Sequence, residues 1–309
     1  MAQYFNLTLD TTAPSGGSIT VDSYYNAAGS IGLNAGSAGA SFMKVWVNQT
    51  AAGSASDAEV PSSWEPYANS KTVTFSNQGT NYVHALFMDE VGNISAVVDS
   101  SATVFDSVAP VISAVSINDG ADYTNDVNIT VRVSVSDVTS GVDYVVLSGD
   151  ITETDDAAKF TFNATDRTNG YKDCAVTLAS TDGSKTVSAV ATDIAGNSSI
   201  SVSDTITLDT TPASAILTLK KSDDSANLPA YVNATGFAAA ISTEDTDIVS
   251  YKLWGDVIDA TSEPAGWTAA SFTDGRMLVD NLLFTSGEGT KTVNVKIRDI
   301  GGNVTTLTS

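Results

Sequence analysis

The stretch from Val187 to Ala213, VSAVATDIAGNSSISVSDTITLDTTPA, predicts two β-strands joined by a tight turn and followed by a domain boundary. Val187, Ala189 and Ala191 alternate with polar residues, which is the pattern of a strand with one buried face. In the turn, the Asp193 side chain can accept hydrogen bonds from backbone amides, and the Gly and Asn that follow tolerate positive φ. The second strand stops before Pro212, because proline cannot donate to a sheet ladder.

Both parts of this stretch recur, which indicates an internal repeat. The turn Asp193-Ile194-Ala195-Gly196-Asn197 matches Asp89–Asn93 and Asp299–Asn303, with spacings of 104 residues (Asp89 to Asp193) and 106 residues (Asp193 to Asp299). The boundary segment Leu208-Asp209-Thr210-Thr211-Pro212 matches Leu9–Pro14 and, more loosely, Phe105–Pro110.

A period near 100 in a chain of 309 residues predicts three domains: 1–106 with an N-terminal strand, 107–209 and 210–309. Each is about the size of an immunoglobulin-like β-sandwich. No long window shows apolar residues at helical spacing, so we expect almost no helix. The predicted fold is therefore all-β, with three tandem immunoglobulin-like domains in an elongated arrangement.

The composition excludes several functions. A net charge of −22 and a pI near 4.1 argue against nucleic-acid binding, which needs Lys and Arg at the phosphates. No stretch is apolar for long enough to span a membrane. The N-terminal MAQYFNLTLD lacks the basic and apolar regions of a secretory signal. The single cysteine, Cys174, cannot form an intrachain disulfide, and we expect its side chain to be buried.

The same alternation precedes all three turns and predicts the core. Its apolar members are Val83, Ala85 and Phe87, then Val187, Ala189 and Ala191, then Val293, Val295 and Ile297. The alternation puts His84, the only histidine, on the outer face of its strand with Leu86 and Met88. We expect that face to meet a neighbouring subunit or loop, and His84 has no partner at a spacing that suggests catalysis or zinc binding.

Two long polar segments carry aromatic residues and have two interpretations. Trp64 and Tyr67 lie in the first repeat, and Trp267 lies in the third. An exposed Trp in a loop can anchor a binding partner. Alternatively, these rings fold back and cover one end of the sandwich, since burying an aromatic side chain is strongly favourable.

The third repeat has only a short segment after its turn, and the N-terminus carries a segment that resembles the missing strand. After Asn303 only VTTLTS remains, whereas the first two turns are followed by a full strand. At the other end, Tyr4-Phe5-Asn6-Leu7-Thr8-Leu9 resembles that strand without a domain before it. One hypothesis is that Tyr4, Phe5, Leu7 and Leu9 pair with an open sheet edge of another chain. The alternatives are pairing on the first domain itself, or a third domain with a shorter last strand.

The Asp-x-x-Gly-Asn turns and Leu-Asp-Thr-Thr boundaries resemble tandem bacterial immunoglobulin-like domains over essentially the whole chain. Such domains occur in bacteriophage virion structural proteins and in bacterial surface adhesins. The Lys44-Val45-Trp46 and Lys252-Leu253-Trp254 blocks, each followed by a later Trp, resemble the phage versions. The resemblance to adhesins implies calcium between domains, with Asp10, Asp89, Asp106, Asp193, Asp209 and Asp299 as candidate ligands. The alternative is that Asp89, Asp193 and Asp299 only stabilise their turns.

The resemblance to the phage versions implies a virion structural protein, such as a capsid or tail decoration, a collar or a fibre component. It would assemble with copies of itself or with other virion proteins, and a weak contact with a host surface is a further expectation. The absence of an export signal favours the virion over the alternative, a fragment of a calcium-binding adhesin on a bacterial surface. No constellation of residues predicts catalysis, and we expect no enzyme activity and no cofactor.

Overall fold

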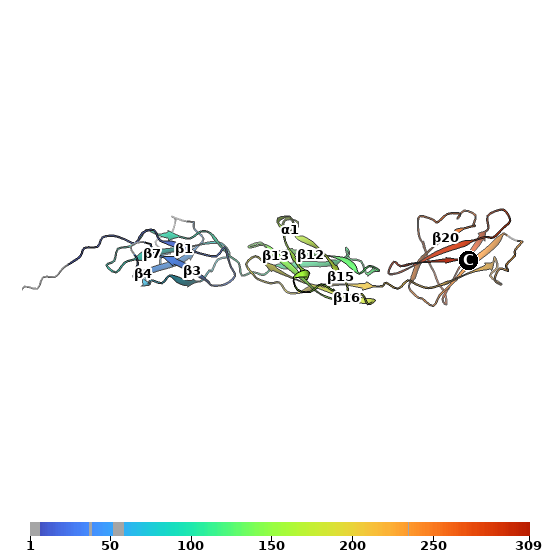
Figure 1. The fold of residues 1–309 in the computed structure, drawn as a ribbon, viewed down its shortest axis with the longest axis horizontal. Helices are drawn as coiled ribbons and strands as arrows, with labels where there is room; N and C mark the ends of the chain where they lie inside the picture. The colour runs from blue at the N-terminus through green and yellow to red at the C-terminus, as the bar shows by residue number, and fades with distance from the viewer. Residues whose placement is uncertain (1–6, 37–38, 52–58, 234) are drawn as a thin grey trace, which may run out of the picture.

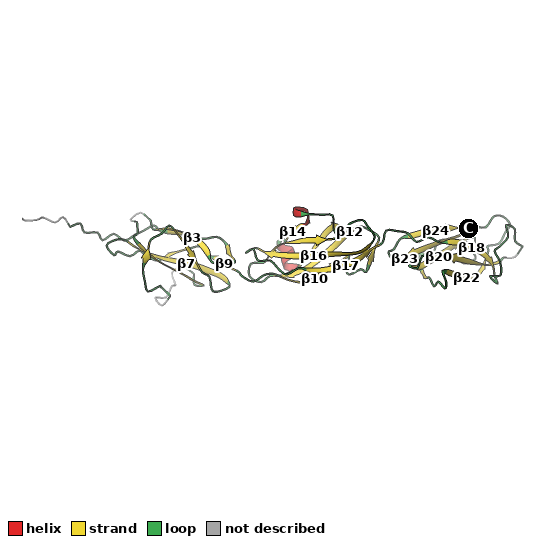
Figure 2. Ribbon diagram, turned by 90° about the horizontal axis from the view of Figure 1, so that it is seen from below, coloured by secondary structure: helices red, strands yellow, loops and turns green. Residues whose placement is uncertain are grey.

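The computed structural model describes residues 7–36, 39–51, 59–233 and 235–309, and it places three β-sandwich domains in a row (Figure 1). Strands occupy all three domains, and among the described residues helix is limited to two short segments in the second one (Figure 2). The predicted all-β class is confirmed. Each domain also has a separate core, because the clusters of buried apolar residues do not extend from one domain to the next.

The first domain packs a small sheet against a larger one. The small sheet contains β1 (Ser18–Thr20), β3 (Gly29–Asn34) and β6 (Ser70–Val73). The larger sheet contains β2 (Tyr24–Tyr25), β4 (Phe42–Asn48), β5 (Glu65–Pro66), β7 (Gly79–Met88), β8 (Val98–Asp99) and β9 (Thr103–Phe105).

The second domain repeats this plan. One sheet contains β10 (Val111–Ile117), β12 (Asn128–Ser136) and β15 (Tyr171–Thr177). The other contains β11 (Tyr123–Thr124), β13 (Val142–Gly149), β14 (Lys159–Thr161), β16 (Gly183–Asp193) and β17 (Val202–Leu208). Along the chain, the 3₁₀ turn η1 (Asp155–Ala158) lies between β13 and β14. The helix α1 (Ala164–Asn169), whose N-terminus is capped by Asn163, lies between β14 and β15.

The third domain has fewer strands. One sheet contains β18 (Ile216–Lys221), β19 (Gly236–Ser242) and β22 (Arg276–Leu283). The other contains β20 (Ile248–Gly255), β21 (Thr268–Ala269), β23 (Val293–Asp299) and β24 (Val304–Thr308). Its core divides into two clusters, one around Ile241 and Ile297 and one around Phe237 and Phe284.

The predicted core positions are buried. All nine apolar residues of the alternation before the turns have no exposed surface: Val83, Ala85, Phe87, Val187, Ala189, Ala191, Val293, Val295 and Ile297. Cys174 is also fully buried, as expected. Burial raises the pKa of its thiol to about 12, so the thiol stays protonated and unreactive at neutral pH.

The outer-face position of His84 is not an exposed one. Its side chain points away from the core, as alternation requires, but its exposure is 0%. Nδ1 lies 2.6 Å from Asp99 Oδ1, and Nε2 lies 2.8 Å from Asn48 Oδ1. The Trp46 ring stacks against the imidazole. The expected cover of this face, a neighbouring subunit or a loop, is supplied at His84 by side chains of the same domain.

Each of the first two domains ends in a strand that pairs in parallel with a two-residue strand near its start. β9 pairs with β2, and β17 pairs with β11. The second residues of these short strands, Tyr25 and Thr124, are 8% and 9% exposed. In the third domain, Tyr231 and Val232 precede β19 by the same spacing, are 94% and 44% exposed, and pair with no described strand. β24 has five residues against seven in β17.

The alternation makes Leu147 a core residue of the second domain, with 2% exposure. We expect Leu147→Ala to lower the free energy of unfolding of that domain by about 2–5 kcal/mol, through lost burial and the cavity left behind. Chemical denaturation followed by circular dichroism measures this change. Val138→Ala is the matched control, because Val138 is 97% exposed, and it should change stability by less than about 0.5 kcal/mol.

Candidate metal centres at the domain junctions

Three carboxylates meet where the first domain joins the second. Asp106 directly follows β9, Asp137 follows β12, and Asp193 ends β16 at the start of the predicted turn. One oxygen from each lies within 4.8 Å of the others. Asp106 and Asp193 are 0% and 1% exposed, so two of the three charges are buried. We call this group the first triad.

The turn positions the first triad. Gly196 has φ of 96°, which allows the chain to reverse so that the amide N–H of Asn197 donates to Asp193 Oδ1 over 2.8 Å. The Asn197 side-chain amide donates to Asp193 Oδ2 and to the backbone carbonyl of Asp106, each over 2.8 Å. One side chain therefore orients a carboxylate of the second domain and fixes the last residue of the first.

The second junction repeats the arrangement. Asp209 follows β17, Asp247 directly precedes β20, and Asp299 ends β23. Their oxygens also lie within 4.8 Å of one another. Asn303 donates its backbone N–H to Asp299 Oδ1 over 2.8 Å and its side-chain N–H to the Asp209 carbonyl over 2.9 Å. We call this group the second triad.

The second triad carries an electrostatic conflict within the protein. Asp247 Oδ1 is buried and no hydrogen-bond donor reaches it among the described residues. Burial raises the pKa of Asp247 above its ordinary value, and the negative charges of Asp299, Asp209 and Asp245 raise it further. Within the described ranges, no Lys, Arg or His forms an ion pair with a carboxylate of either triad.

The donor set fits a hard divalent cation. Calcium is bound by carboxylate and carbonyl oxygens, and three converging carboxylates supply such ligands. The cation in turn supplies the positive charge that compensates buried carboxylates. A cation would compensate the buried Asp247 Oδ1, which has no hydrogen-bond donor among the described residues. In each triad the ion would be held by the last residue of one domain and by two residues of the next.

The first repeat does not form a third triad. Asp89 Oδ1 accepts hydrogen bonds from the backbone amides of Val91, Gly92 and Asn93, and Oδ2 accepts one from the Asn93 side chain. Burial acts to raise the pKa of Asp89, but these hydrogen bonds outweigh it and lower that pKa. No described acidic or histidine side chain joins Asp89 and Asp10 in a cluster. Asp89 therefore stabilises its own turn through these hydrogen bonds.

Of the six aspartates that the sequence suggested as ligands, the structure brings four into the triads: Asp106, Asp193, Asp209 and Asp299. Sequence reasoning missed Asp137 and Asp247. Asp137 lies five residues before the first residue of its next strand, and Asp247 lies one residue before its own. Comparing the repeats could not find them, because they occupy different positions of the same loop.

The predicted interaction residues lie apart from the triads. Tyr67 packs inside the first domain, where its hydroxyl donates to the Leu33 carbonyl over 3.1 Å. Trp64 lies beside Lys44, and Trp267 lies beside Lys252 and Arg298, with cation–ring distances of 4.9, 5.0 and 4.7 Å. Leu7 and Leu9 are 95% and 85% exposed. Tyr4 and Phe5 lie outside the described residues. A role of these residues in binding stays a prediction.

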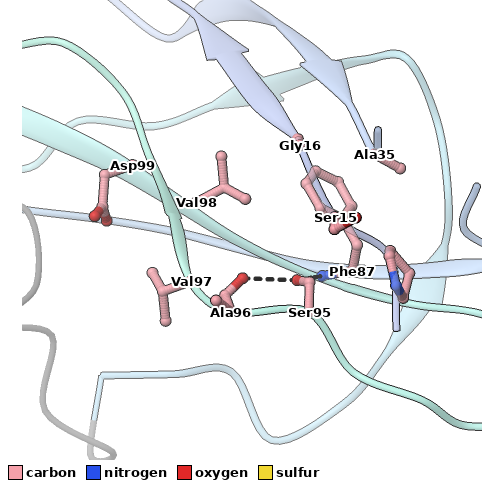
Figure 3. Close-up of a pocket in the computed structure, with 11 residues that line it drawn as sticks. Ser15, Gly16, Ala35, Phe87, Ser95, Ala96, Val97, Val98 and Asp99 are labelled. Carbon is pink, nitrogen blue, oxygen red and sulfur yellow. Dashed lines mark hydrogen bonds between the residues drawn. The ribbon is translucent and has the colours of Figure 1, made fainter. Parts of the chain in front are cut away.

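The first domain also has a hollow of about 450 Å³ beside β8 (Figure 3). Phe87, Val97 and Val98 line it, and the hydroxyl of Ser95 donates to the Ala96 carbonyl at its rim. Its one ionisable residue is Asp99, whose carboxylate already contacts His84. The hollow thus offers no free charged group for catalysis. In the described part of the chain, no helix has the length and apolar character needed to cross a bilayer.

Because of the charge conflict at Asp247, we expect Asp247→Asn to stabilise the protein without calcium and to destabilise it, relative to the wild type, with calcium. Without divalent cations the variant should melt at a higher temperature than the wild type, because one of three repelling charges is gone. In calcium it should lose most of the stabilisation that the wild type gains, because a ligand is gone. Differential scanning calorimetry in chelator and in calcium measures both effects. Asp280→Asn, at an exposed position of the same domain, is the matched control and should show neither.

The same residue sets a pH dependence. A carboxyl whose folded pKa is raised stabilises the fold below its unfolded pKa, near 3.8, and this stability is lost as the pH rises through the folded pKa. In chelator, the wild type should therefore lose stability between acid and neutral pH more steeply than Asp247→Asn. If stability in chelator falls with pH equally steeply in the two proteins, the raised pKa does not belong to Asp247.

A scan against protein-family models gives no match, and neither does a search of curated proteins. Solved structures of tandem β-sandwich modules are similar. A bacterial ice-binding adhesin of 1.5 MDa has 15% identity, covers 97% of each chain and has a TM-score of 0.34. A tetra-tandem repeat from the extending region of a large adhesion protein has 18% identity, covers 95% of this chain and 74% of its own, and has a TM-score of 0.26.

Fibronectin(III)-like modules of CbhA from Clostridium thermocellum have 15% identity, cover 62% of this chain and 94% of their own, and have a TM-score of 0.34. At these identities and scores the likeness says nothing about function. The chain itself is a tandem array of three immunoglobulin-like β-sandwich domains.

Proposed function

We propose that this chain is a spacer segment of a surface-displayed fibre, of the bacterial adhesin type, in which divalent cations stiffen the joints between immunoglobulin-like domains. The observation that supports it is the pair of junction triads, each built from the last residue of one domain and two residues of the next. Such a role is structural and requires no catalysis.

The physical reason lies in the linkers. β9 ends at Phe105 and β10 begins at Val111, and β17 ends at Leu208 while β18 begins at Ile216. Domains joined by short linkers move relative to one another unless an interface holds them. A cation held by carboxylates of both domains removes that freedom without a large apolar interface. A chain of such joints keeps its length, which a spacer requires.

A virion component that assembles with copies of itself or with other virion proteins is the second candidate. Two exposed surfaces favour it. Leu7 and Leu9 belong to a segment with the sequence of a domain-ending strand, and they are 95% and 85% exposed. Tyr231 and Val232 occupy the position that receives such a strand in the other two domains. Pairing between chains would cover both surfaces.

The spacer proposal predicts calcium binding at two sites per chain, which isothermal titration calorimetry can count. Asp193→Asn and Asp299→Asn should each remove or weaken one site, by roughly tenfold or more, or about 1.4 kcal/mol. Asp89→Asn is the matched control: it alters the same position of the turn but no triad, so both sites should remain. A wild-type chain that binds no calcium would overturn the proposal.

The virion candidate predicts association between chains. The mass measured by light scattering should rise with protein concentration. A Leu7→Asp, Leu9→Asp double variant should stay monomeric. In the matching strand of the second domain the equivalent residues, Ile206 and Leu208, are buried, and charged side chains cannot occupy such positions. Val91→Asp, at a position that is 64% exposed, is the control. A monomeric wild type at every concentration would exclude pairing through this segment.

A further inference from the structure

The two junctions are held by different numbers of direct hydrogen bonds. At the first, Asp106 Oδ2 accepts from the backbone N–H and the hydroxyl of Ser140, over 3.0 and 2.6 Å. Its carbonyl accepts from the Asn197 side chain over 2.8 Å. Asp106 itself belongs to the first domain, because its N–H donates to the Tyr25 carbonyl. Three hydrogen bonds from the second domain therefore fix this residue without any ion.

The second junction lacks the contacts of Ser140. Counted back from the first residue of the next strand, Ser140 corresponds to Thr246, which is exposed and makes no side-chain hydrogen bond within the described residues. Within the described ranges, the Asp209 carboxylate accepts only from the backbone N–H of Thr211 in its own linker, over 3.2 Å. The side-chain contact from the third domain is the one from Asn303 to the Asp209 carbonyl.

Other hydrogen bonds near the second junction hold the linker to one side only. Asp182, in the second domain, accepts from the backbone N–H and hydroxyl of Thr210 and from the hydroxyl of Thr211. Asp245, in the third domain, accepts from Ser214. Thus each end of the linker is anchored to its own domain, and little but the triad spans the gap between them.

The carboxylate charges are also better compensated by hydrogen bonds at the first junction than at the second. In the first triad, hydrogen bonds from Ser140 and Gly141 reach Asp106 and Asp137 and compensate part of their charge. In the second triad, Asp247 Oδ1 has no donor among the described residues, and the Asp247 carboxylate lies close to those of Asp209 and Asp299. Without a cation, the second set of carboxylates repels across the joint, and one hydrogen bond opposes it.

We infer that the second junction is a hinge that divalent cations close, whereas the first junction stays fixed with or without them. This inference rests on the proposed cation sites. The first and second domains then move as one body, and the third domain swings about the segment between Leu208 and Ile216 when the cation is removed. The fibre bends at one defined joint and not at every joint.

Pulsed electron paramagnetic resonance between spin labels on engineered cysteines tests the hinge. Ser76→Cys with Ser201→Cys spans the first junction, and Ser201→Cys with Glu288→Cys spans the second; all three positions are exposed. The native Cys174 is fully buried and does not label. In chelator, the distance distribution across the second junction should be at least about twofold broader than in calcium, while the distribution across the first should stay the same.

Two variants make the test specific. Ser140→Ala removes the hydroxyl hydrogen bond to Asp106 and keeps the backbone one, so the distribution across the first junction should broaden in chelator. Calcium should restore the narrow distribution, because the ion replaces the lost hydrogen bond. Asp247→Asn should weaken the narrowing by calcium across the second junction. Circular dichroism confirms that both variants are folded.

The outcomes separate the inference from the proposed function. Equal broadening of both junctions in chelator, or no effect of Ser140→Ala, would overturn the hinge while leaving the cation sites standing. A second junction that does not respond to calcium, in a protein that binds calcium by calorimetry, would also overturn the hinge alone. Absence of calcium binding by calorimetry would overturn the spacer proposal itself.

Discussion

Each junction depends on one asparagine side chain. Asn93, Asn197 and Asn303 each follow a turn glycine, and each donates its side-chain N–H to the backbone carbonyl of the aspartate that closes the preceding segment, Asp10, Asp106 or Asp209. The distances are 3.2, 2.8 and 2.9 Å. Because the donor and acceptor are fixed by their own domains, this bond sets how one domain meets the next. The carboxylates of each triad converge beside this contact, and at the first junction the hydrogen bonds from Ser140 to Asp106 add to it.

The convergence opposes ordinary electrostatics. Three carboxylates within 4.8 Å repel one another, and burying two of them in the first triad adds a desolvation cost. The backbone tolerates this because the hydrogen-bonded turns place the aspartates regardless of their charge. Asp89 and Asp247 show opposite outcomes: hydrogen bonds within its turn lower the pKa of Asp89, whereas burial and nearby carboxylates raise the pKa of Asp247, which lies in a different loop. The difference arises from the groups that surround each carboxylate.

Strand periodicity and the repeated turns were enough to predict the core and part of each triad from the sequence. The alternation around Val187 and Val293 identified core residues correctly, and the spacing of the turns placed Asp193 and Asp299 in equivalent positions. Neither pattern predicted Asp137 and Asp247, because loops bring them to the triads from unequal distances along the chain. A cover over the face of His84 was expected, but not which residues form it, because alternation tells which face of a sheet a side chain takes and not which other side chains lie across that face.

The parallel pairing of β17 with β11 has a consequence for a chain under tension. Tension along the row of domains pulls on the second domain through β10, which begins at Val111, and through β17, which ends at Leu208. The hydrogen bonds from Thr207 to the Asp122 carbonyl and from Asp209 to the Thr124 carbonyl lie across the direction of the pull. They are loaded in shear, so they must break together and not one after another. The third domain has no such pair at Tyr231 and Val232 among its described strands, so we expect it to be the first of the three to yield under load.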